Sequence, residues 1–197
     1  MLNIPSEAES ITAIFPKYTA TGDHTVIYLC SGKQLTGKTR VATVIRKLAN
    51  ARAIDLYTLK KQTAAITQRS ILQPLPLTPS LILVPVKIRI PRLPGDSSTG
   101  YFNYRAVTGV SPGPEDGPPD CKAVIHLTGG LTLPCVWTVR TIKKYMQYAC
   151  LTACRTPGPL RQTLCETSPG YVPDLEPILQ KLLEVLGDIL HFRRLQG

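Results

Sequence analysis

Apolar residues along this chain recur with two periods, every second position in some stretches and every third or fourth in others. Two β-branched runs, 11–15 and 25–30, flank the turn-like Thr21-Gly22-Asp23 and predict a hairpin. Helical spacing of five apolar residues then predicts a helix that begins near Arg40. These residues are Val41, Val44, Ile45, Leu48 and Ala49. The other face of this helix carries Arg40, Arg46, Lys47 and Asn50.

The middle of the chain is divided by prolines. A second helix is predicted over 53–66, and it ends before the proline-rich segment 73–79. The run 81–90 (LILVPVKIRI) predicts a strand. Because Pro85 has no N–H to donate to a neighbouring strand, it indicates an edge position or a bulge. Another strand is predicted over 101–107, after a turn at 95–100.

The second half begins after an irregular loop at 112–119, which we take as the best internal boundary. Strands at 123–127 and 131–136 flank Thr128-Gly129-Gly130, a strong hairpin signal. A helix follows over 139–154, then a proline-containing linker at 156–172. The last segment, 173–197, begins with a capping Asp174 and predicts an amphipathic helix, which would dock on the protein's own core or on another subunit.

These elements predict an α+β fold, in which antiparallel hairpins and strands pack with two or three helices, plus the C-terminal amphipathic helix. Residues 1–110 would form an N-terminal half with the basic helix. Residues 120–155 would add a hairpin-plus-helix unit to the same compact domain. The chain has 197 residues and a hydrophobic content of 43%, enough to bury a core.

The sequence also indicates the cellular compartment of the protein. No apolar stretch is long enough to cross a bilayer, and the N-terminus lacks the pattern of a secretory signal. We therefore expect a cytoplasmic protein without a membrane partner. Six cysteines are expected to remain thiols in that reducing compartment.

The net charge of +10 is concentrated in one window of the chain. Nine basic residues lie between Lys33 and Arg69, against the single acid Asp55. Such a window attracts polyanions, of which nucleic acid is the commonest, although a solvated helix face is the simpler alternative. The candidate phosphate contacts are Arg40, Arg46, Lys47, Lys60 and Lys61, with Lys143 and Lys144 as a second patch.

A phosphate-loop pattern, G-x-x-x-x-G-K-[ST], occurs at 32–39. Its candidate residues are Gly32, Gly37, Lys38 and Thr39, between a predicted strand and a predicted helix. However, no later strand supplies the aspartate that would hold magnesium, and the hairpins that follow do not resemble repeated βαβ units. A nucleotide-binding site therefore stays a minor alternative. If there is no such site, Gly32 is a hairpin turn residue.

Other catalytic or metal-binding patterns are weak. The three histidines lie far apart in the sequence, and the carboxylates of the middle region fall in predicted turns. Cys150 and Cys154 are one helical turn apart and could bind a metal with Cys165, but structural zinc sites usually have two cysteine pairs or histidines as well. We expect no enzymatic activity, no cofactor and no metal.

The order of blocks resembles the ComK family of competence transcription factors from Gram-positive bacteria. The resemblance covers about residues 10–155. It runs through ITAIFP, TVIYLCSG, PLPLTPSLILVPV, GYFNYRAV, AVIHLTGGLTLP and TVRTIKKYMQYACLTA. GYFNY stands where relatives more often have a tryptophan-containing turn, and the tail from Leu160 to Gly197 is extra.

The resemblance implies a DNA-binding transcriptional activator that recognises A·T-rich duplex DNA, largely through the minor groove, as a homo-oligomer. The basic residues named above are compatible with this function. Two alternatives stay open: a non-enzymatic interaction or scaffold protein that assembles through the last helix, and the nucleotide-binding protein.

Overall fold

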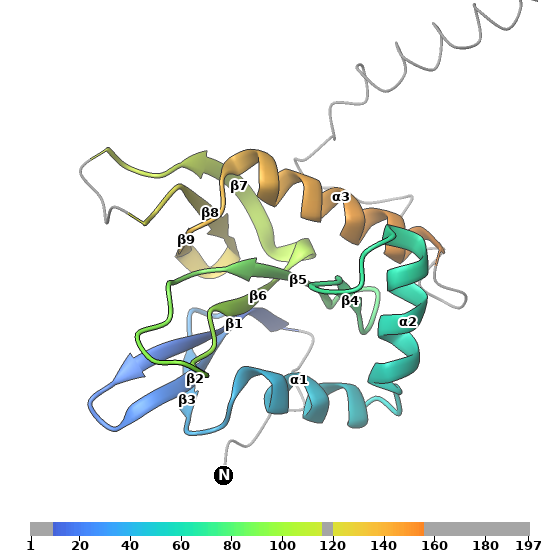
Figure 1. The fold of residues 1–197 in the computed structure, drawn as a ribbon, viewed down its shortest axis with the longest axis horizontal. Coiled ribbons are helices and arrows are strands. Elements are labelled where there is room, and N and C mark those ends of the chain that lie inside the picture. Colours follow the sequence, from blue (N-terminus) through green and yellow to red (C-terminus); the bar gives the residue numbers. More distant parts are fainter. Residues whose placement is uncertain (1–9, 116–119, 156–197) are drawn as a thin grey trace, which may run out of the picture. The chain divides into compact units, whose positions relative to one another are not determined.

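The computed structural model describes residues 10–115 and 120–155, which belong to one compact unit of the chain. The predicted linker at 156–172 and the predicted C-terminal helix at 173–197 lie outside the described residues. Within the described part, antiparallel sheets pack with three helices, so the α+β fold class is confirmed (Figure 1).

The larger sheet, sheet A, is antiparallel throughout and has the strand order β3-β2-β1-β6-β5-β4. Its strands are β1 (Ile11–Thr19), β2 (Gly22–Leu29), β3 (Gln34–Gly37), β4 (Leu75–Pro76), β5 (Ile82–Lys87) and β6 (Thr99–Asn103). The predicted N-terminal hairpin is confirmed as β1 and β2. Its strands are longer than predicted, and Gly22, with φ +117°, begins β2 next to the turn.

Strand β5 explains the position of Pro85. β6 lies along one side of it, whereas β4 pairs only with Ile82 and Leu83 on the other side. Pro85 therefore lies beyond the end of β4, where β5 is an edge on that side, as its missing N–H predicts. The strand ends at Lys87, three residues earlier than predicted.

The smaller sheet, sheet B, is an antiparallel meander with the order β7-β8-β9. It consists of β7 (Val107–Pro112), β8 (Ala123–Leu127) and β9 (Leu131–Cys135). The hairpin predicted around Gly129 and Gly130 is confirmed, and both glycines have positive φ angles. Residues 113–122 connect two paired strands of this sheet, so the segment taken as an internal boundary joins neighbours.

The two sheets meet at Asn103, a buried residue whose side chain makes four hydrogen bonds. It donates to the carbonyl oxygens of Ile11 (3.1 Å) and Ser80 (2.8 Å), and it accepts from the amides of Ile82 (3.2 Å) and Arg105 (3.1 Å). The bond from Arg105 begins a 3-10 turn, η2 (Tyr104–Ala106), which leads into β7. The single strand predicted over 101–107 is therefore wrong, because the chain changes sheet at this turn.

The helices are α1 (Val41–Asn50), α2 (Leu56–Thr67) and α3 (Val139–Arg155). All five apolar residues that predicted α1 are buried. α2 begins three residues later than predicted, because Asp55 caps it. Its buried residues are Leu59, Thr63 and Thr67.

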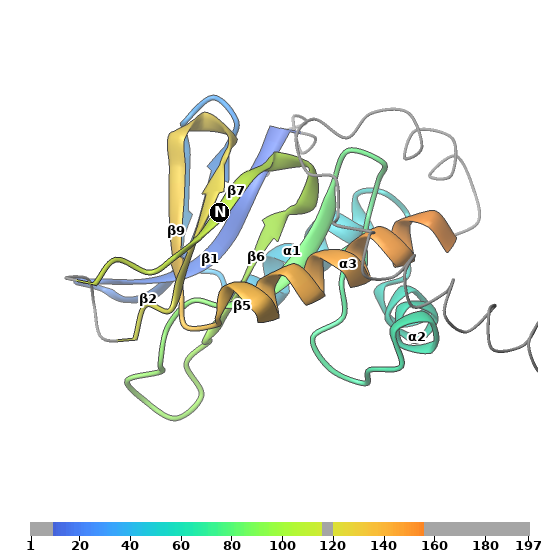
Figure 2. The same ribbon diagram turned by 90° about the horizontal axis from the view of Figure 1, so that it is seen from above.

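The helices cover different parts of sheet A. α1 packs with Ile14 and Ile27 of the sheet in one buried cluster, and Leu83 of β5 belongs to the same cluster. α3 packs against β5, α2 and β7. Figures 1 and 2 show α1 and α3 on opposite sides of sheet A, with α2 beside the β4 edge. Any function shared by α1 and α3 must therefore act on two sides of the sheet.

Candidate nucleic-acid interface

Positive charge dominates the described part of the protein. Residues 10–115 and 120–155 contain 19 Lys and Arg but only 5 Asp and Glu. The only ion pair within these ranges joins Arg89 to Asp23, with an N–O distance of 2.6 Å. Most of the cations therefore have no carboxylate to neutralise them in this part of the chain, and they create a positive potential at its surface.

Helix α1 turns its basic residues to solvent because its opposite side is buried against sheet A. Arg40 and Arg46 are exposed, and Lys47 is half-buried. Arg52, just after the helix, instead donates from Nη1 to the carbonyl oxygen of Leu48 at 3.0 Å. This bond places a cation at the negative end of the helix dipole. Arg40, Arg46 and Lys47 are thus the α1 cations available to a ligand.

The sole acid near these cations, Asp55, is engaged by its own helix. Its carboxylate accepts from the amides of Tyr57 (3.0 Å) and Thr58 (3.2 Å) and from the Thr58 hydroxyl (2.5 Å). The hydroxyl bond, followed by the Tyr57 amide, lowers the pKa of Asp55 below its usual value of 3.8. Lys60 and Lys61 on the same helix are exposed. Asp55 therefore stabilises the start of α2 and forms no ion pair with either lysine.

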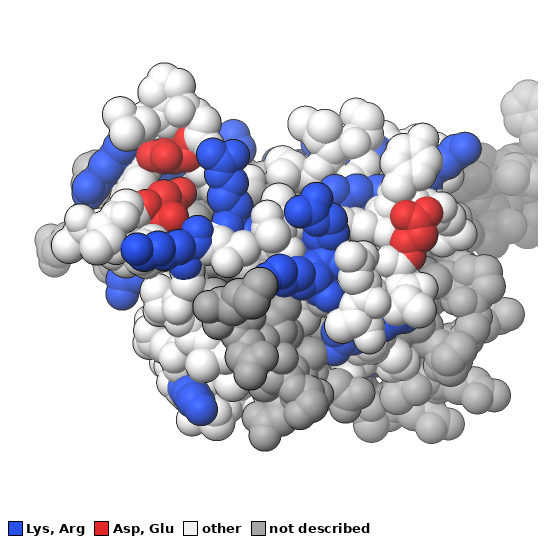
Figure 3. Space-filling model, turned by 90° about the horizontal axis from the view of Figure 1, so that it is seen from below, with Lys and Arg blue, Asp and Glu red and all other residues white. Residues whose placement is uncertain are grey.

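Together these residues form the α1–α2 surface, which we define as Arg40, Arg46, Lys47, Lys60 and Lys61. Figure 3 shows Lys and Arg side chains in a band over the face that contains α1 and α2, with one acidic group beside it. A second group of cations lies on the same face, around two further acids. Such a face can contact an extended polyanion at several points.

The second predicted patch lies elsewhere. Lys143 and Lys144 are exposed on α3, across sheet A from α1. The Nζ atom of Lys144 lies 5.9 Å from the centroid of the Tyr148 ring, and the Arg69 guanidinium lies 5.9 Å from the same ring. Burial would raise the pKa of Tyr148, but hydrogen bonding and charge from Arg69 and Lys144 outweigh it, so the pKa is lowered. The structure thus separates this patch from the α1–α2 surface.

The phosphate-loop pattern does not fold as such a loop. Gly32, with φ +81°, forms a tight turn in which its amide donates to the Leu29 carbonyl at 2.9 Å. Residues 34–37 then form β3, which pairs with β2 along its whole length. Lys38 and Thr39 follow β3 before α1 begins. A backbone that is paired in a sheet cannot curl its N–H groups around a phosphate. Gly32 is instead a turn residue, as the alternative interpretation of this pattern predicted.

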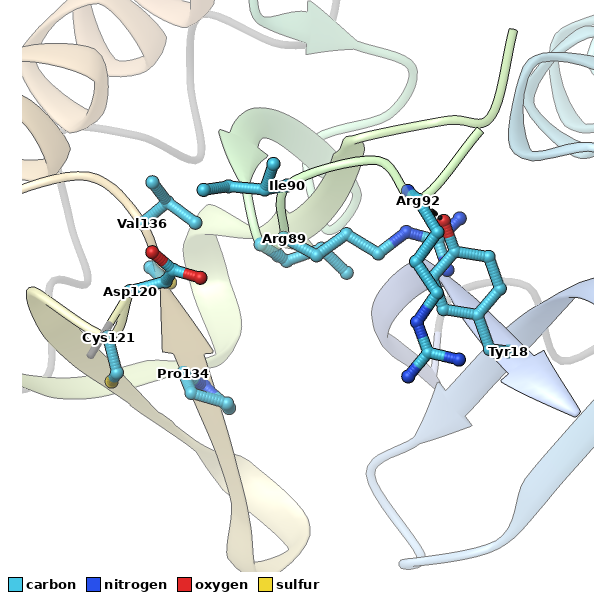
Figure 4. A pocket seen from close by; sticks show the side chains of 10 residues that line it. Tyr18, Arg89, Ile90, Arg92, Asp120, Cys121, Pro134 and Val136 are labelled. Atoms are coloured by element: carbon cyan, nitrogen blue, oxygen red, sulfur yellow. Dashed lines mark hydrogen bonds between the residues drawn. The ribbon is translucent and has the colours of Figure 1, made fainter. Parts of the chain in front are cut away.

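A cluster of charged and aromatic side chains at the β1–β2 and β5–β6 turns was not predicted. The guanidinium groups of Arg89 and Arg92 lie 3.8 Å and 4.6 Å from the centroid of the Tyr18 ring. The Tyr18 hydroxyl donates to Asp96 at 2.7 Å and accepts from the Arg92 amide at 2.8 Å. Figure 4 shows both arginines gathered at this ring. We call Tyr18, Asp23, Arg89, Arg92 and Asp96 the tyrosine cluster.

A pocket of about 280 Å³ separates the tyrosine cluster from sheet B. Arg89 and Arg92 line it beside Tyr18, and Asp120 faces them from the other wall (Figure 4). The rest of its lining is largely apolar, from Ile88, Ile90, Cys121, Pro134, Cys135 and Val136. The pocket therefore offers charges of both signs around an apolar floor.

The described ranges contain no group of three or more His, Cys, Asp and Glu residues placed to hold a metal ion. Cys150 and Cys154 lie on α3, and Cys165 lies outside the described residues. Cys30, Cys121, Cys135 and Cys150 are free thiols. Burial, with a smaller contribution from Cys121, raises the pKa of the Cys135 thiol to about 12, so this thiol stays neutral. None of the helices in this part of the chain is long and apolar enough to span a bilayer.

No family model, curated protein or solved structure matches this chain. Function must therefore be inferred from the charges, contacts and shape of the chain itself.

Proposed function

We propose that this protein binds double-stranded DNA through the α1–α2 surface. The observation that carries the proposal is the charge of residues 40–61, where six Lys and Arg accompany one acid. That acid, Asp55, is hydrogen-bonded to the start of α2. The six cations thus outnumber the single carboxylate on a helical face that is fixed from behind by a buried core.

The physics of this interaction is counterion release. Duplex DNA carries a condensed layer of cations, and each Lys or Arg that neutralises a phosphate releases them into solution. The two helices hold the backbone of these cations in place, so little backbone order has to be gained when they bind. Lys143 and Lys144 lie across the sheet, and a straight duplex on the α1–α2 surface would not reach them.

The proposal extends to the kind of protein. In line with the resemblance to competence transcription factors, we propose a cytoplasmic transcriptional regulator that prefers A·T-rich duplexes and acts as a homo-oligomer. Selecting bound fragments from random duplexes tests the preference. Enrichment of an A·T-rich repeat supports a regulator, whereas no enrichment at moderate salt reduces the proposal to nonspecific DNA binding.

The salt dependence of duplex binding tests the α1–α2 surface. Each lost phosphate contact should reduce the slope of log affinity against log salt by about 0.9, so R46A/K47A should reduce it by about 1.8. K60A/K61A should act similarly, and K143A/K144A, which removes the same charge from α3, is the matched control. Equal slopes for the parent and both α1–α2 variants would remove this surface from the interface. No duplex binding by the parent protein would favour an interaction or scaffold role.

A further inference from the structure

The β5–β6 connection presents apolar side chains to solvent on a braced tip. Residues 88–98 join the two strands, and the base of this segment is closed by the Ile88 amide, which donates to the Ser98 carbonyl at 3.1 Å. The Arg89 Nε atom donates to the Ser97 carbonyl at 2.8 Å. At the tip, the Asp96 amide donates to the Leu93 carbonyl at 3.2 Å. Pro91 and Pro94 further restrict the backbone here.

The tyrosine cluster fixes this tip to the β1–β2 hairpin. Arg89 pairs with Asp23, and the ring of Tyr18 lies against the guanidinium groups of Arg89 and Arg92. Tyr18 also joins the two ends of the tip, since its hydroxyl contacts Arg92 on one side and Asp96 on the other. Cation–π contacts of this type are attractive, because the guanidinium charge lies against the negative face of the ring. The tip is therefore held in one conformation before any partner binds.

The tip exposes two large apolar side chains that are close together in the sequence. The side chain of Leu93 is 66% exposed and that of Ile90 is 58% exposed. Pro91, Arg92 and Pro94 between and beside them are also exposed. Apolar side chains kept in water have no stabilising role in the folded monomer, whereas a cation between them favours an anionic partner.

The acids near the tip cancel only part of its positive charge. Asp23 is paired with Arg89, and Asp96, which accepts the Tyr18 hydroxyl, opposes two further cations. Arg92 is exposed in the tip, and Lys17 of β1 is exposed beside Tyr18 in the sequence. In Figure 3 a group of cations around two acids lies on the same face as the α1–α2 band. A polyanion that covers α1 and α2 can thus extend to a second basic region on this face.

We propose that Leu93, on the tip braced by Tyr18, Arg89 and Arg92, inserts as an apolar wedge between two base pairs of duplex DNA and bends the duplex. This proposal rests on the DNA binding proposed above. Proteins that bend DNA combine apolar wedges such as Leu, Ile or Pro with adjacent Arg or Lys that contact the groove and phosphates. Leu93 supplies the wedge and Arg92 the adjacent cation. The brace keeps the wedge from folding back when it meets the stacked bases.

Energy transfer between dyes at the two ends of a duplex measures the bend, and fluorescence anisotropy on the same samples measures binding. At saturating protein and low salt, the parent should shorten the end-to-end distance, and L93S should lose most of this change. L93S should also bind roughly tenfold more weakly, because a leucine side chain loses its burial, with an unchanged salt slope. L93F keeps a wedge and should still bend the duplex.

Leu151→Ser is the matched control, since Leu151 is another exposed leucine, 45% exposed on α3. It should bend the duplex as the parent does. Bending by L93S equal to that of the parent, or binding by the parent without bending, overturns the wedge and leaves the α1–α2 interface standing. A change in self-association of L93S with unchanged bending would assign the tip to a second copy of the chain and also overturn the wedge. Absence of duplex binding by the parent overturns both proposals.

Discussion

A Cβ atom at Gly129 would lie only 2.7 Å from the carbonyl oxygen of Cys30. The turn of sheet B is thus pressed against the turn that follows β2 in sheet A. Neighbouring contacts join the same turns, since the Tyr28 hydroxyl lies 3.4 Å from the Gly129 carbonyl oxygen and donates to it. Gly32 is the first glycine of the phosphate-loop pattern. A Cβ atom added to it would lie 3.7 Å from the same Gly129 carbonyl oxygen. The first residue of the phosphate-loop pattern therefore lies where the turns of sheet A and sheet B pack together.

Substitution of Gly129 by alanine should destabilise the protein. The residue has φ +79°, and an added methyl group would meet backbone atoms that cannot move aside. We expect a loss of about 3 kcal/mol or more, from backbone strain together with overpacking. Gly130→Ala is the control, because Gly130 has φ +75° but no atom within 4 Å of the added Cβ, and it should cost only about 1–2 kcal/mol. Equal free energies of unfolding in a urea titration would show that the turns do not press together.

Two substitutions of Asp55 should distinguish its role as the cap of α2 from the effect of its negative charge on DNA binding. D55N keeps an oxygen that can cap α2 and removes the one acid of the α1–α2 region, so it should bind duplex DNA more tightly at low salt with little change in melting temperature. D55A should bind more tightly as well but melt at a lower temperature. Weaker DNA binding by D55N would contradict the proposed interface.

The Asp55 cap should also depend on pH. Its folded pKa lies below the ordinary value of 3.8, so its stabilisation is complete above that value and is lost as the pH falls through the folded pKa. The difference in melting temperature between the parent and D55A should therefore shrink below about pH 4. A difference that persists into stronger acid would argue against a role for the ionised carboxylate.

Because the tyrosine cluster braces the tip, we expect slow hydrogen exchange at the backbone amides of the tip. Tyr18→Phe removes the hydroxyl that accepts from the Arg92 amide and donates to Asp96, while the ring stays against both guanidinium groups. Hydrogen exchange at the Arg92 amide should become faster, with a loss of about 1 kcal/mol in overall stability. If Leu93 acts as a wedge, Y18F should also bend DNA less than the parent at equal saturation. Unchanged exchange at Arg92 would show that the hydroxyl does not brace the tip.

Cys135 should make the protein sensitive to alkali. Its thiol has a pKa of about 12 when folded, against an ordinary value of 9.0, so between these values the unfolded chain loses a proton that the folded chain keeps. Stability from this group is complete below pH 9 and falls as the pH rises towards 12. Cys135→Ala should show a smaller decrease in melting temperature between pH 9 and pH 11 than the parent. Cys30→Ala, at an exposed cysteine, serves as the control.

Local patterns predicted the elements whose signals lie within one short stretch. α1 follows from apolar residues at helical spacing, and the β8–β9 hairpin follows from Gly129 and Gly130, whose positive φ angles few other residues adopt. The basic face of α1 follows from the same spacing. The sequence pattern therefore predicts Arg40, Arg46 and Lys47 as surface cations.

Features that depend on distant residues were missed. β3 has only four residues, and pairing with β2 defines it. The tyrosine cluster joins Tyr18 to Asp96 and Asp23 to Arg89, pairs that are 78 and 66 positions apart in the sequence. The separation of Lys143 from α1 likewise depends on which side of sheet A each helix covers. No periodicity within a single segment contains this information.

Asn103 ties the end of β6 to β1, to the strand β5 and to the turn that starts β7. A side chain shared in this way couples the melting of one sheet to that of the other. Calorimetry on the intact protein should then record residues 10–155 as one cooperative transition, and Asn103→Ala should lower its midpoint without splitting it.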